Sequence, residues 1–196
     1  MANWAFVFYI IEGPMKTLKK IEQAILHPKV KEDSSEDWEG NVLNTLGISW
    51  ISRDQDREHG KYMRGFIKEE PWIYNGTLKF SAEEAWNLTN FAEVLSEAFP
   101  EIKVYWNMEE SGMGIYGTND AEGKYFPERV LIDTCIDGDY EMDYFINDES
   151  VFNHLSKITN GKVKNQEDVN KFNNEHELAG TDEDNYILIH HFEIFE

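Results

Sequence analysis

The chain has 196 residues, 41% hydrophobic and 14% aromatic, which supplies a packed core and excludes wholesale disorder. Its formal net charge is −20, and its single cysteine excludes an intramolecular disulfide and favours a reducing, cytoplasmic compartment. The excess of acid is concentrated in residues 101–196, which hold 22 Asp/Glu and 7 Lys/Arg. Such a field repels nucleic acid and anionic lipid, so we expect no direct contact with either and a basic protein as the favoured partner.

Residues 4–12 are the first predicted strand. Both of its alternating faces are apolar, which is typical of a central strand covered on two sides. Its apolar run, 4–11, is far shorter than the roughly 20 residues that cross a membrane. We therefore expect no membrane span.

Periodicity predicts the elements of the first 120 residues. Strands are expected, in chain order, at 4–12, 62–68, 77–80, 102–108 and 113–118, with turns at Asn75-Gly76 and 109–112. Helices are expected at 15–27 and from about residue 88 to 99. Residues 42–50 fit either a helix or a strand, and residues 81–86 either extend a strand or begin a helix. The order is βαββαβ plus an added hairpin strand, which is a ferredoxin-like antiparallel sheet with helices on one face.

The remaining residues predict a β-α-α-β extension. Its elements are a strand at 129–136, a helix at 148–160 capped by Asp148 or Ser150, a polar helix at 165–177 and a strand at 186–195. The chain is therefore an α+β protein with a core at 1–120 and an acidic extension at 121–196 packed on it, or one continuous domain.

Three sets of residues in the first 120 carry a family resemblance. They are the pair Ala85-Trp86 after a strand, the helix ending Leu95-Ser96 with Phe99-Pro100, and Glu110 with Gly112 and Gly114 after the next strand. With Trp4 at the start, this pattern resembles the YubB-type ferredoxin-like domain of small plasmid- and phage-associated proteins. Asn87-Leu88 departs from it, because the family usually has prolines there. The resemblance implies a fold and carriage on a mobile element, and it implies no activity.

Alternating carboxylates are the sharpest local feature. Asp133, Asp137, Asp139, Glu141 and Asp143 are all odd-numbered, so a single strand would place them on one face. This face predicts a patch for a basic partner, a phosphate-like surface that mimics DNA, or a cation site. A solvated strand face is the simpler interpretation, because alternate side chains on a strand lie roughly 6.5–7 Å apart, too far to share one ion.

His191 and Glu193 share a face of the last predicted strand, whereas His190 points to the other. They form a candidate acid–base pair, or a hydrogen-bonded structural pair. Cys135 lies in an apolar strand and is expected to be buried. Trp38 and Trp72 lie in predicted connections and are candidate exposed anchors for a partner, unless they fold back onto their own domain.

These patterns predict a non-catalytic macromolecular interaction protein that presents an acidic surface, as a DNA mimic or a mobile-element accessory factor. No catalytic residue, cofactor or metal is assigned. The alternative is a metal-assisted or acid–base hydrolase that uses the acidic strand face with His191 and Glu193. A homodimer formed through an unpaired sheet edge is a third possibility.

Overall fold

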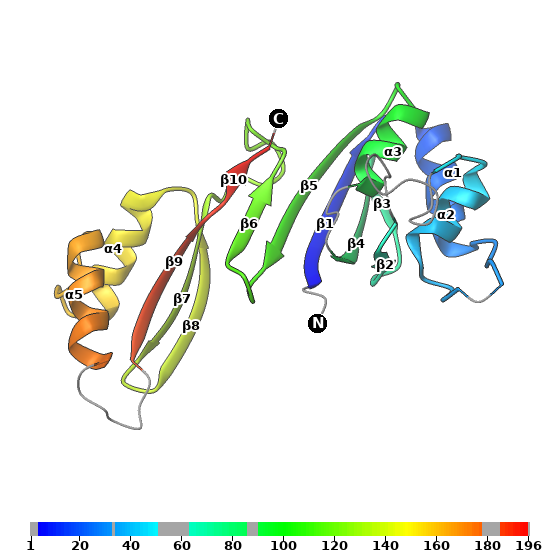
Figure 1. The fold of residues 1–196 in the computed structure, drawn as a ribbon. Coiled ribbons are helices and arrows are strands. Elements are labelled where there is room, and N and C mark those ends of the chain that lie inside the picture. The colour runs from blue at the N-terminus through cyan, green and yellow to red at the C-terminus, as the bar shows by residue number, and fades with distance from the viewer. Residues whose placement is uncertain (1–3, 33, 51–62, 86–89, 178–184, 196) are drawn as a thin grey trace. The chain divides into compact units, whose positions relative to one another are not determined.

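The computed structural model describes residues 4–32, 34–50, 63–85, 90–177 and 185–195. It confirms the α+β class: the described residues form five helices and two mostly antiparallel sheets (Figure 1). The chain divides into two compact units, residues 1–121 with 194–196 and residues 122–193. None of the described helices is both long enough and apolar enough to cross a membrane.

A seven-stranded sheet organises the first unit. Its strands are β1 (Trp4–Glu12), β2 (Gly65–Ile67), β3 (Trp72–Tyr74), β4 (Thr77–Ala85), β5 (Lys103–Glu110), β6 (Ile115–Thr118) and β10 (Glu193–Ile194). The order is β10-β6-β5-β1-β4-β2, and β3 also pairs with β4. Helices α1 (Met15–Leu26), α2 (Glu39–Leu46) and α3 (Asn90–Ala98) lie on one side of this sheet (Figure 1). We call the opposite side the open face.

The structure decides the stretches that the sequence left ambiguous. Residues 81–85 extend β4, because Phe80, Ala82 and Glu84 alternate toward the helices along it. Most of 42–50 belongs to α2, and β3 is a strand that periodicity did not predict. The turn between β3 and β4 has positive φ angles of 49° at Asn75 and 79° at Gly76, as Asn-Gly hairpins require. Trp86 and Asn87-Leu88, which enter the family resemblance, lie outside the described residues.

The prediction that β1 is covered on two sides is wrong for one end of the strand. Its odd residues, from Ala5 to Ile11, are fully buried in the core under the helices. Trp4 and Phe6 face the other way and remain 44% and 45% exposed. The sequence shows two apolar faces, but only contacts distant in the chain decide which of them is covered.

The second unit is a three-stranded sheet with two helices. Its elements are β7 (Val130–Ile136), β8 (Asp139–Phe145), α4 (Asp148–Ile158), α5 (Gln166–Glu177) and β9 (Tyr186–His191). The strand order is β8-β7-β9, and apolar residues of α4 and α5 pack with Val130, Ile132 and Ile187 in one core.

The N-cap of helix α4 is neither of the two predicted residues, Asp148 and Ser150. Asn147 caps it, since its side chain accepts the backbone N–H of Ser150 at 3.0 Å, and Ser150 Oγ accepts the N–H of Asn147. The last predicted strand, 186–195, is two strands that separate at Phe192 and belong to different sheets.

Candidate functional site

The five predicted acidic residues do not share one face. The segment is a hairpin, with positive φ at Asp137 and Gly138 in its turn, and the strand β8 was not predicted. The register places Asp133 opposite Met142, whereas Asp139, Glu141 and Asp143 lie opposite Ile136, Thr134 and Ile132. Residues directly opposite in an antiparallel pair share a face. The odd-numbered residues after the turn therefore lie on the opposite face from the odd-numbered residues before it.

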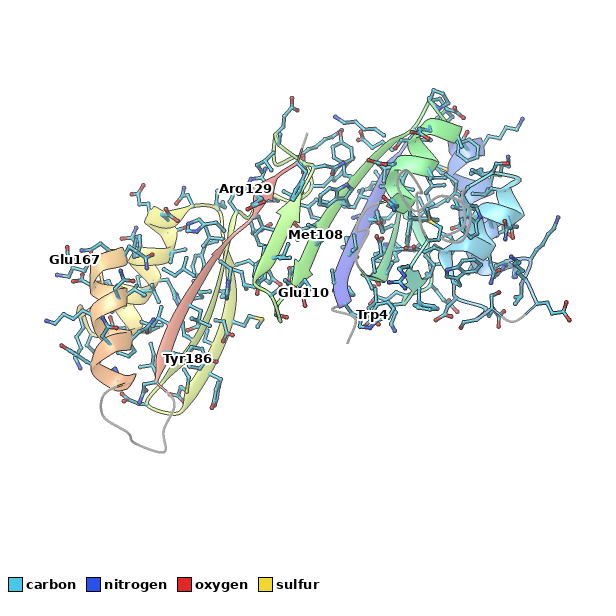
Figure 2. All side chains as sticks on the ribbon, in the orientation of Figure 1. Trp4, Met108, Glu110, Arg129, Glu167 and Tyr186 are labelled. Atoms are coloured by element: carbon cyan, nitrogen blue, oxygen red, sulfur yellow. The ribbon has the colours of Figure 1, made fainter. Side chains whose placement is uncertain are left out.

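The carboxylates of this hairpin have separate local partners. Asp133 accepts a hydrogen bond at 3.0 Å from the hydroxyl of Tyr186, which begins β9 (Figure 2). Burial together with this bond raises the pKa of Tyr186 to about 12. On the other face, Glu141 lies 2.8 Å from Nε2 of His154 on α4. The acidic residues are thus dispersed over two faces and a turn.

His191 is paired with Asp148 and not with Glu193. Its Nε2 lies 2.7 Å from Asp148 Oδ1 at an exposed position near the start of α4. Phe192, which is buried, separates His191 from the exposed Glu193 of β10. His190 lies on the other face of β9, where burial lowers its pKa. Among the described residues, no group of three or more His, Cys, Asp or Glu side chains is placed to hold a metal.

The two candidate tryptophan anchors have different environments. Trp38 is half-buried: its indole N–H donates to the carbonyl of Met63 at 3.0 Å, and its ring meets Trp50 edge-on at 5.1 Å. It folds back onto its own unit. Trp72 is exposed on β3, with its ring 5.9 Å from that of Phe8. Only Trp72 thus stands on an accessible surface. Cys135 is buried.

Aromatic side chains gather on the open face of the first unit. The register of β1, β2 and β3 against β4 places six of them there, namely Trp4, Phe6, Phe8, Phe66, Trp72 and Tyr74. Trp4 stands at the start of β1 (Figure 2). Trp4, Phe6, Trp72 and Tyr74 are between 39% and 60% exposed. Large exposed apolar patches of this kind mark interaction surfaces.

Charged residues are interspersed among these rings. Lys68 pairs with Glu83 at 2.8 Å, and the ammonium group of Lys79 lies 5.9 Å from the centre of the Tyr74 ring. Lys103, at the other side of β1, lies 4.6 Å from the centre of the Tyr105 ring. The open face therefore combines charges of both signs with aromatic rings, and aromatic residues are enriched in protein-binding surfaces.

A second cluster, of buried acids, lies beneath the helices. Glu39 begins α2 and Glu84 is on β4; their side chains are only 1% and 2% exposed. The hydroxyl of Tyr9, fully buried on β1, donates to Glu84. Gly65 on β2 admits the Glu39 carboxyl, because a Cβ at that position would overlap it. Four elements thus enclose two carboxyl groups.

The electrostatics of this cluster favour a retained proton. Burial, then the nearby charge of Glu84 and a hydrogen bond to it, raise the pKa of Glu39 well above its ordinary value. Burial and the same carboxylates raise the pKa of Tyr9. Two adjacent buried carboxyls cannot both ionise cheaply, so they share a proton. With almost no exposed surface, the pair forms a pH-sensitive part of the core.

Sequence reasoning missed this pair. Glu39 follows a run of polar residues, and Glu84 lies in the stretch 81–86, which fits either a strand or a helix. One signal was present: Glu84 continues the even-numbered series of Leu78, Phe80 and Ala82, so a strand through 85 would bury it. Its partner in α2 could not be found this way, because the contact joins residues that are distant in sequence.

Comparison of the chain with protein-family models, with curated proteins and with solved structures gives no match.

Proposed function

We propose that this chain is a non-catalytic macromolecular interaction protein that binds a protein partner through the open face of its first unit. The observation that carries the proposal is the set of four exposed aromatic side chains, Trp4, Phe6, Trp72 and Tyr74, on one face of one sheet. Tryptophan and tyrosine at the centre of an interface contribute most of its binding energy.

The second unit supplies the charge that selects the partner. Residues 122–193 contain 17 Asp/Glu against 6 Lys/Arg, a net of −11. Because their carboxylates are spread over the exterior, this unit steers basic proteins toward the molecule over several ångströms of solvent. The partner is therefore a protein with an apolar contact surface and a basic region, and a DNA-binding protein has that chemistry.

A ferredoxin-like arrangement of residues 1–120 is part of the same proposal. In its support, β1 lies between β4 and β5, all antiparallel, and the helices share one side of the sheet. The resemblance to YubB-type domains remains an inference from the sequence of residues 1–120, and with it the role as a mobile-element accessory factor.

Affinity capture from native cytoplasm tests the proposal if open-face variants are compared with a matched control. The test variant carries Trp72→Ser and Tyr74→Ser. The control carries Met113→Ser, at a residue that is more exposed than either but lies in the β5–β6 turn. We expect that the wild type and the control capture a protein that the test variant does not. Salt should reduce the amount captured. Displacement of the captured protein by duplex DNA is the result expected of nucleic-acid mimicry. Capture of the same proteins by all three chains would contradict the proposal.

A further inference from the structure

The sheet of the second unit has two edge strands, and a side chain closes one of them. Asn173 on α5 lies beside β9: its Nδ2 donates to the carbonyl of Ile187 at 2.8 Å, and its Oδ1 accepts the N–H of Ile187 at 2.9 Å. These two bonds imitate those of a further strand. Covering an edge in this way prevents another chain from pairing with it.

The other edge is β8. β7 lies on one side of β8, and the described residues place no strand on its other side. The N–H of Tyr144 donates to the side chain of its neighbour Asp143 at 2.9 Å, so it points away from β7. Main-chain groups alternate in direction along an antiparallel strand, so those of Met142 also point outward. β8 thus presents a pairing edge centred on Met142.

Side chains on β8 form two rows of different chemistry. The acidic row is Asp139, Glu141 and Asp143, on the side of α4. The apolar row is Tyr140, Met142 and Tyr144, of which Tyr140 is 73% and Met142 60% exposed. None of the seven residues of β8 is buried. The side chains of a strand added at this edge would lie beside both rows, one row on each face of the sheet.

A second copy of this chain is a poor occupant of the edge. If two β8 strands paired antiparallel about Met142, Glu141 of each would lie opposite Asp143 of the other. Like charges directly opposite each other destabilise a strand pair. Lysine or arginine in those positions would instead attract, and an apolar residue between them would cover Met142.

We propose that β8 binds an extended segment of another protein in which basic and apolar residues alternate, by addition of a strand to the sheet. This site belongs to the second unit, and the proposal does not depend on the proposed role of the open face.

Titration of the full, isotope-labelled chain with synthetic peptides tests the proposal. The probe is a peptide of about eight residues that alternates lysine and valine, long enough to span an average strand. We expect the amide of Met142 to exchange roughly tenfold more slowly when peptide is bound, because it then donates to the added strand. A peptide of the same composition in the order Lys-Lys-Val-Val should bind roughly tenfold more weakly, since it cannot match both rows.

Two changes to the backbone complete the test. Met142→Pro removes the outward N–H and leaves the bonds of its neighbours to β7, so it should abolish binding, whereas Met142→Thr should keep it. If Met142→Pro does not fold, N-methylation of alternate peptide residues blocks the same bonds with the wild-type chain. Unchanged exchange at Met142, equal binding of the Lys-Lys-Val-Val peptide, or undiminished binding of the N-methylated peptide would each overturn the proposal.

Discussion

Replacing Glu39 by Gln tests whether the buried carboxyl pair retains a proton. In the wild type the protonated carboxyl of Glu39 faces Glu84, and the Gly65 N–H donates to Glu39. A glutamine amide has nearly the same shape, donates to Glu84 through its NH2 group, and accepts from Gly65 through its oxygen. It therefore imitates the protonated acid permanently and keeps the packing around Gly65.

The pH dependence follows from the direction of the pKa shift. The pKa of Glu39 is raised in the folded state, so between its ordinary value, 4.5, and that raised value the folded chain binds more protons than the unfolded chain. Its stabilising contribution is complete below pH 4.5 and is lost as the pH rises through this interval. A single proton changes the free energy of unfolding by about 1.4 kcal/mol per pH unit. Glu39→Gln should gain this amount over the wild type with each unit of pH.

Urea unfolding of both chains between pH 5 and 8 measures the difference. The control is Glu36→Gln, which makes the same change at an exposed residue one turn earlier in the chain. For this control, the free energy of unfolding should depend on pH as it does in the wild type, because an exposed side chain is in contact with water in both the folded and the unfolded chain. Parallel pH profiles for the wild type and Glu39→Gln would show that the pair does not hold the additional proton, and the reasoning from burial would fail.

Two further predictions concern the second unit. Asn173→Ala should lower the free energy of unfolding by about 1–3 kcal/mol, because the N–H and C=O of Ile187 lose their partner; Asn174→Ala, at the next residue, is the control, and equal losses would contradict the assigned role. Asp133→Asn should lower the pKa of Tyr186 from about 12, because the carboxylate that opposes its ionisation is gone; ultraviolet titration measures this, and an unchanged alkaline transition would show that burial alone sets the value.

Local periodicity was sufficient for the elements whose burial follows a regular pattern. The first strand, the helices at 15–26 and 148–158, and the alternation of Val104, Trp106 and Met108 along β5 were all predictable, because one face of each carries the apolar residues of a core. The hairpin at Asp137-Gly138 was not predicted, and that omission reversed the faces assigned to three carboxylates, Asp139, Glu141 and Asp143. A two-residue turn returns the chain antiparallel, so odd and even positions no longer keep the same side.

The candidate sites depended on longer-range contacts. The acidic charge of residues 101–196 could be counted from the sequence, but the pairing of His191 with Asp148 and the burial of Trp38 against Trp50 could not. Nor could the exposure of Trp4 and Phe6, which have the composition of a buried strand. In each case the deciding neighbour belongs to another element.

The sequence by itself determined that this is an acidic α+β protein, and it placed most of the helices and strands. Those properties depend on composition and on the spacing of residues that are close along the chain. Only the tertiary structure decided that Glu39 and Glu84 meet, that Asn173 bonds to the edge of β9 while no described strand lies beside the outer edge of β8, and which face of β1 is covered. These depend on packing between distant segments, and a side chain carries no local signal of what will lie against it.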